Sequence, residues 1–242
     1  MNATNDTSRS TELSLRTAAI VAGLGLLVMA ILAAFANFSV IQNLVVPGDA
    51  NATAVKILAN AGSFRMGICF FLLTAILDVI VAWALYILLK PVNKSLSLLA
   101  ALFRVVYAAI FAAALTNLFN ALLLFTGADY LKVFDTKQLF AQGMASLGAF
   151  QSGWDIGLVI FGLHLILVGY LIFKSGYAPQ WLGIVLGLLL AIGGIGYMAD
   201  SFGKFILPGY SGTIAQFTFI GEVALIFWLL WKGIKGFDKR LN

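Results

Sequence analysis

Six apolar runs, each long enough to cross a lipid bilayer, dominate this sequence of 242 residues. They occupy residues 17–40, 64–89, 96–126, 154–173, 181–198 and 213–231. A helix needs about 20 consecutive apolar residues to cross the hydrocarbon core of a membrane, so each run predicts one transmembrane helix. With 62% hydrophobic and 10% charged residues, the chain is too apolar for a water-soluble domain. We therefore predict an all-α bundle of six transmembrane helices in contact with the lipid bilayer.

The segments outside these runs are short. Residues 1–16 are polar and lack apolar periodicity, which predicts a disordered tail, and residues 232–242 form a basic tail. All four prolines fall between the runs, as expected if the six helices are unbroken. The tripeptide at residues 34–36 resembles a signal-peptide cleavage site, but the first run has full spanning length, so we expect it to be a transmembrane helix.

Two longer loops carry apolar residues at helical spacing. These loops span residues 51–62 and 136–151. They predict short amphipathic helices on the outer membrane surface, and loops that pack over the mouth of the bundle are the alternative.

Lysine and arginine residues predict the orientation of the bundle. Six crossings place both termini on one side, and nine basic residues lie on that side: Arg9, Arg16, Lys90, Lys94, Lys174, Lys232, Lys235, Lys239 and Arg240. Five lie on the other side: Lys56, Arg65, Lys132, Lys137 and Lys204. Because cytoplasmic loops are enriched in lysine and arginine, we expect a protein of the cell membrane with both termini in the cytoplasm.

Composition also excludes several classes of site. Cys69 is the single cysteine and His164 the single histidine, which leaves no thiolate cluster and no multi-histidine site for zinc or haem. We therefore expect no metal and no cofactor. The net charge of +5 comes from residues that flank the apolar runs, so nucleic acid is not an expected partner.

Four ionisable residues lie inside the apolar runs, where a charge is costly and needs an explanation. They are Asp78, Arg104, His164 and Glu222. A rise of 1.5 Å per residue places each of them roughly 13–18 Å from the cytoplasmic end of its run, in one slab near the middle of the membrane. Each shares a helix face with small or weakly polar residues, so we expect all four side chains to point into the bundle.

This slab has two interpretations. Two carboxylates against one guanidinium leave one negative charge, which a proton on His164 or on a carboxyl group would cancel, so a proton-binding site is physically reasonable. A buried arginine paired with an acid can also serve only to fix the register of the helices. A second set of ionisable residues, Arg65, Asp155 and Asp200, lies at the outer ends of three runs and is a candidate entrance.

Small residues in the fifth run form a stripe at four-residue and three-residue spacing. They are Gly183, Gly187, Ala191 and Gly194. Such stripes let helix backbones approach closely in lipid, so we expect central helix packing here, with dimerisation as the alternative.

Several strings of the sequence resemble a known family. They are VPGDA at 46–50, LYILLKPVN at 85–93, SLLAALFRVV at 97–106, GLHLILVGYLIFKSGYAPQWLG at 162–183 and GYMADSF at 196–202. Together they resemble the bacterial and archaeal membrane family described as domain of unknown function 4386, over about residues 16–233. The resemblance implies a small multi-helix membrane protein and transfers no reaction. Asp49, Arg104, His164 and Asp200 lie within the matching strings, whereas Asp78 and Glu222 do not.

Three functions remain open at this point. The first is a carrier or sensor of a small solute or a proton that uses the slab of Asp78, Arg104, His164 and Glu222. The second is a membrane enzyme that acts on lipid, for which no nucleophile motif is visible. The third is an interaction protein without a solute. The sequence favours the first, leans away from an enzyme, and leaves the oligomeric partner open.

Overall fold

The computed structural model describes residues 14–237, and all regular structure in this range is helical. The elements are α1 (Leu15–Ala34), η1 (Phe35–Ile41), α2 (Gln42–Leu44), α3 (Ala50–Ala59), α4 (Ala61–Leu89), α5 (Lys94–Thr126), η2 (Asp129–Leu131), α6 (Thr136–Lys174), α7 (Gln180–Ile206), α8 (Ala215–Thr218) and α9 (Ile220–Lys235). Residues 15–16 and 232–235 of the expected tails are helical, while residues 1–13 and 238–242 lie outside the described range.

Within that range, six helical segments are long and apolar enough to cross a membrane. Five are α4, α5, α6, α7 and the continuous run from Leu15 to Leu44, and the sixth runs from Ala215 to Lys235 across α8 and α9. This confirms the predicted all-α fold with six candidate membrane spans.

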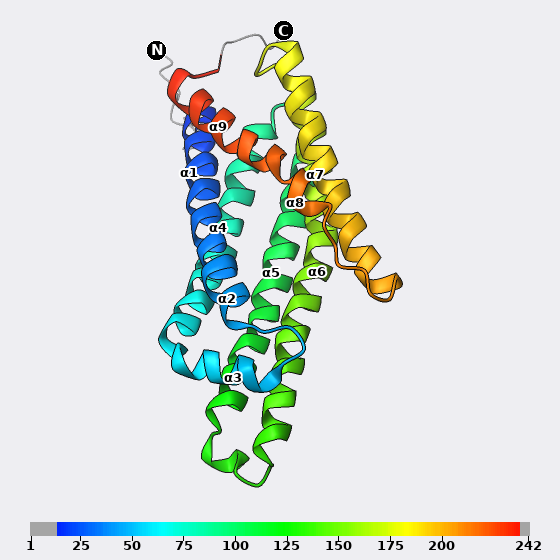
Figure 1. The fold of residues 1–242 in the computed structure, drawn as a ribbon. Coiled ribbons are helices and arrows are strands. Elements are labelled where there is room, and N and C mark those ends of the chain that lie inside the picture. The colour runs from blue at the N-terminus through cyan, green and yellow to red at the C-terminus, as the bar shows by residue number, and fades with distance from the viewer. Residues whose placement is uncertain (1–13, 238–242) are drawn as a thin grey trace, which may run out of the picture.

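Figure 1 shows the six spans from the side. Their contacts form a closed ring. Around it, α1 contacts α4, α4 contacts α5, α5 contacts α6, α6 contacts α7, and α9 closes the ring between α7 and α1. The Nε atom of Arg16 donates a hydrogen bond of 2.7 Å to the carbonyl oxygen of Gly233. The start of α1 and the end of α9 therefore lie at one end of the bundle, which we call the near end. The far end carries α3 and the turn between α5 and α6.

Helices α5 and α6 extend past the rest of the bundle at the far end (Figure 1). They contain 33 and 39 residues. At 1.5 Å per residue their lengths are about 50 and 58 Å, whereas the hydrocarbon core is about 30 Å thick. Asp135 starts α6 with a reciprocal capping box, and Gly127 ends α5 with a φ of 65°, which glycine adopts readily.

One of the two predicted surface helices is present and the other is not. Helix α3 is separate, and it contacts α4, α5 and α6, so it covers part of the far end. The prediction was wrong for residues 136–151, which are the first turns of α6. Once the capping box has started the helix, no proline interrupts it before Ser175, so it continues without a break.

Two spans are less regular than predicted, although neither contains a proline. Residues 35–41 form a π-helix, which widens the first span close to α4. The last span is interrupted at Phe219, between α8 and α9. The expectation of unbroken helices was therefore wrong for the last span, whereas the first span is continuous from Leu15 to Leu44.

Helices α6 and α7 approach each other through glycines. A Cβ atom on Gly162 would lie 2.5 Å from the carbonyl oxygen of Gly194, and one on Gly169 would lie 2.5 Å from that of Gly187. No larger residue fits at such a distance, so the two backbones are in direct contact. Gly187 and Gly194 belong to the predicted stripe, whose role in central packing is confirmed.

Candidate functional site

Three of the four predicted midplane residues meet in the core. Asp78 on α4, Arg104 on α5 and His164 on α6 are each about 1% exposed. The Nη2 atom of Arg104 lies 2.8 Å from Oδ1 of Asp78, and its Nη1 atom lies 3.2 Å from Nε2 of His164. The predicted inward orientation is confirmed for these residues, which we call the polar triad.

The contacts of His164 determine which ring nitrogen carries a proton. Arginine can only donate hydrogen bonds, so Nε2 of His164 must accept from Arg104. The other nitrogen, Nδ1, lies 2.8 Å from the carbonyl oxygen of Ala100 and must donate its hydrogen to it. In this arrangement the imidazole is neutral, and the guanidinium and the Asp78 carboxylate balance each other's charge.

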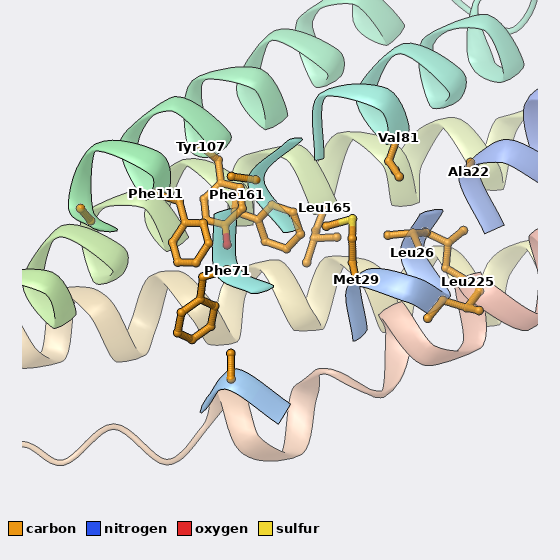
Figure 2. Close-up of a cluster of buried hydrophobic side chains, with 14 of the residues drawn as sticks. Ala22, Leu26, Met29, Phe71, Val81, Tyr107, Phe111, Phe161, Leu165 and Leu225 are labelled. Atoms are coloured by element: carbon orange, nitrogen blue, oxygen red, sulfur yellow. The ribbon is translucent and has the colours of Figure 1, made fainter. Parts of the chain in front are cut away.

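Arg104 also contacts apolar groups from two helices. Its Nη2 atom lies 4.0 Å from the sulfur of Met29 on α1, and its Cζ atom lies 5.2 Å from the centre of the Phe161 ring on α6. The position over the ring is a cation–π contact. Figure 2 shows part of the buried apolar core, in which the rings of Tyr107, Phe111 and Phe161 lie together and Leu165 lies between Phe161 and Met29. The guanidinium therefore touches four helices: α1, α4 and α6, and its own.

The polar triad is not fully hydrogen-bonded. Among the described residues, Oδ2 of Asp78 and Nε of Arg104 have no hydrogen-bond partner, although both atoms are buried. Buried polar atoms without a partner are rare in native proteins and mark places that need an explanation. One carboxylate oxygen in the centre of the ring is thus available to accept a proton or a hydrogen bond.

Glu222 lies apart from the polar triad. Its Oε1 atom accepts a hydrogen bond of 2.6 Å from the hydroxyl of Tyr197 on α7, and both side chains are only partly buried. Glu222 is in the first turn of α9, directly after the interruption at Phe219, where the helix dipole favours a negative charge. Phe161 packs 5.9 Å from the Tyr197 ring and also contacts Arg104, so this aromatic side chain lies between the two polar groups.

The predicted entrance residues differ in their contacts: Asp155 and Asp200 have polar partners, and Arg65 is exposed. Asp155 binds the ammonium of Lys204 at 2.8 Å, and Asp200 accepts hydrogen bonds from the Tyr210 hydroxyl and the backbone N–H groups of Ile214 and Ala215. Asp155 thus joins α6 to the last turn of α7, and Asp200 holds the segment that connects α7 to α8. The contact with Asp200 raises the pKa of Tyr210, because it stabilises the protonated phenol.

Arg65 does not join this group. Its side chain is exposed on α4, and no described contact links it to Asp155 or Asp200. The role of the three residues as an entrance stays a prediction.

Sequence reasoning missed four contributors: Met29, Phe161, Tyr197 and Lys204. Met29 and Phe161 look like any other apolar residue of a span. Tyr197 is the second-last residue of the predicted fifth run, but α7 continues to Ile206, so Tyr197 lies more than two helical turns before the end of the helix.

The described residues contain no group of three histidine, cysteine, aspartate or glutamate side chains that could hold a metal ion. The polar side chains of the site can bind protons and form hydrogen bonds. Asp78 and Glu222 can each accept a proton, Nε2 of His164 can accept one in place of the Arg104 contact, and Arg104 can hold an anionic group.

Comparison with known proteins agrees with the architecture. The model of the family described as domain of unknown function DUF4386 matches residues 21–233. A protein from Archaeoglobus fulgidus, itself described as uncharacterised, is 41% identical over 182 residues, which cover 75% of this chain and 93% of the relative. No solved structure matches. This multi-pass membrane protein belongs to the DUF4386 family.

Proposed function

We propose that the protein is a proton-linked carrier or sensor whose responsive element is the polar triad. The observation that carries the proposal is the contact between Nη1 of Arg104 and Nε2 of His164, next to the ion pair of Arg104 with Asp78. Both contacts require an unprotonated partner. A proton on either partner would remove one of the bonds that hold the guanidinium in place.

Loss of such a bond would weaken the connection between helices α4, α5 and α6. Asp78, Arg104 and His164 lie on three consecutive members of the ring, so the guanidinium connects α4 and α6 to α5. Protonation of His164 would place two donors opposite each other, and protonation of Asp78 would leave Arg104 without its counter-charge. Either event favours a different packing of these helices, which is what a proton-linked carrier or sensor requires.

Glu222 supplies a second proton-binding group in this proposal. It is more exposed than the polar triad and lies at the interruption of the last span. Interrupted helices at membrane depth are found in carriers where ions and solutes bind. Phe161 contacts the Tyr197 ring and Arg104, so we expect it to lie beside any path of a proton or a small solute group from Glu222 to Arg104.

The alternative, in which the triad only fixes helix register, rests on its nearly complete burial. A double variant distinguishes a proton-responsive triad from a purely structural one. Replacing both Asp78→Asn and Arg104→Gln removes the charges but keeps hydrogen-bonding groups of similar size, and such neutral replacements of buried pairs are often tolerated. A purely structural triad predicts that this double variant behaves like the wild type at every pH.

The test is a pH titration of the protein in lipid nanodiscs between about pH 8 and pH 4, the range in which histidine and perturbed carboxyl groups titrate. The readout is the tryptophan fluorescence at each pH. We expect a transition in the wild type that is absent from the folded double variant and from His164→Gln. Asp129→Asn, which removes an exposed far-end carboxylate, is the matched control and should retain the transition. A transition of unchanged size in the folded double variant would refute the proposal.

We further propose that the protein lies in the cell membrane with its near end in the cytoplasm. The support is the distribution of basic residues, nine on the side of the termini and five on the other. Single cysteines at positions 94 and 56, in a Cys69→Ala background, report the two sides. An impermeant thiol reagent added to intact cells should label position 56 and not position 94, and the reverse pattern would overturn the orientation.

A further inference from the structure

In the part of the chain that the structure describes, the near end of the bundle carries positive charge and no carboxylate. In the described part of the chain, Arg16, Lys94, Lys174, Lys232 and Lys235 all lie at this end. The seven described carboxylates lie elsewhere: Asp78 and Glu222 at midplane depth, and Asp49, Asp129, Asp135, Asp155 and Asp200 toward the far end. The near end therefore attracts anions.

One cation of this group is unusual because it is buried. Lys232, in the last turn of α9, is only 6% exposed. Its ammonium lies 5.0 Å from the centre of the Trp231 ring and 5.8 Å from that of Phe237, and no described carboxylate pairs with it. A buried lysine normally has an anionic partner, so the described residues leave a place for one.

Two further donors lie within about one helical turn of Lys232. The Nε atom of Arg16 donates to the carbonyl oxygen of Gly233, which holds the guanidinium beside residue 232, and its terminal nitrogens have no described acceptor. The indole N–H of Trp228, four residues before Lys232 on the same face, is buried and has no hydrogen-bond partner. Trp228 is 5% exposed, so this donor is enclosed by protein.

These donors lie where a phospholipid headgroup would. They surround the end of a membrane-spanning helix, and Trp231 and Phe237 add aromatic rings of the kind that mark the membrane interface. A phosphate group offers several acceptor oxygens, which suits an ammonium and a guanidinium together. We propose that Lys232 and Arg16 bind the phosphate of an anionic phospholipid at the near end of the bundle, while the enclosed N–H of Trp228 adds positive potential behind Lys232.

The test compares lipid binding to the full chain in nanodiscs of phosphatidylcholine with and without phosphatidylglycerol. We expect saturable binding of phosphatidylglycerol, seen as lipid retained in native mass spectrometry and as a higher unfolding temperature. Lys232→Gln should weaken this binding about tenfold, the loss of one charge-assisted contact. Lys174→Gln removes an equal charge from an exposed site at the same end and should leave the affinity unchanged.

Three outcomes would overturn the proposal or part of it. An equal loss in Lys232→Gln and Lys174→Gln would show diffuse attraction to a charged surface instead of a site. Equal stabilisation by phosphatidylcholine alone would show that no anionic lipid is selected. If inorganic phosphate saturates the detergent-solubilised protein and displaces phosphatidylglycerol, the site binds free phosphate, and the proposal that it binds a lipid headgroup is overturned. If Lys232→Gln does not fold, Arg16→Gln, which alters an exposed side chain, replaces it with the same expected loss.

Discussion

Helix α6 joins its neighbours in two different ways. Toward α7 it presents Gly162 and Gly169, where the backbones touch without a charged group, and nearer the far end its Asp155 forms an ion pair with Lys204 of α7. Toward α5 and α4 it presents His164, which connects to Arg104 and through it to Asp78. The glycine contact can change only if the helices separate, whereas the polar contact can change when one proton binds. One helix thus combines a fixed interface and a responsive one.

The largest effect should come from leaving a charge of the responsive interface unpaired. Arg104→Ala strands the Asp78 carboxylate in the core, and we expect a loss of about 3–5 kcal/mol in the free energy of unfolding, measured by denaturant titration in nanodiscs. The double variant with Asp78→Asn and Arg104→Gln should recover more than half of that loss. An equally large loss in both would mean that packing of the Arg104 side chain, and not its charge, stabilises this interface.

A smaller effect is expected at the fixed interface. In Gly194→Ala the new Cβ atom would overlap the carbonyl oxygen of Gly162, so α6 and α7 must move apart. Overpacking of this kind costs about 1–3 kcal/mol. Because no titratable group is involved, unfolding measured at several pH values should show the same loss at each of them. If the loss in unfolding free energy grows on acidification, the glycine contact is coupled to the polar triad, and the two interfaces of α6 are not independent.

The hydrogen bond of Glu222 tests whether the second polar group acts independently. Tyr197→Phe removes the donor to Oε1 of Glu222 and should cost about 1 kcal/mol. We expect the fluorescence transition assigned to the triad to persist in this variant, because Phe161 lies between the two groups. Loss of the transition in Tyr197→Phe would show that Glu222 and the triad titrate as one unit.

The smallest effect should come from the ion pair of Lys204 with Asp155. Lys204 is partly exposed, with 28% of its side chain accessible, and pairs screened by solvent contribute about 0.2–1 kcal/mol. The buried Asp155 carboxylate keeps the hydrogen bond from Nε2 of Gln151 when Lys204 is removed. Lys204→Met should therefore lower the unfolding free energy by less than any substitution above, and its effect should shrink at high salt. A loss as large as that of Gly194→Ala would show that this ion pair stabilises the contact between α6 and α7 as much as the glycines do.

The sequence predicted the helices well because apolar length is a local property. The four ionisable residues were also visible, since a charge within an apolar run is rare, and the three that meet do so on adjacent helices of the ring. Glu222 does not join them because α9 starts anew after Phe219, and nothing in the local sequence predicts that interruption. The partners Met29 and Phe161 are invisible in sequence because only tertiary packing brings them to Arg104.

The most direct test of the responsive interface uses the fact that the chain contains one histidine. In protein labelled with ¹⁵N-histidine and studied by NMR in lipid, every imidazole signal comes from His164. At neutral pH a neutral ring is expected with the proton on Nδ1 and none on Nε2, and its Nε2 signal should shift on acidification together with the fluorescence transition, because a proton on either partner alters the contact with Arg104. A proton on Nε2 at neutral pH, or a ring whose signals stay unchanged through that transition, would contradict this expectation.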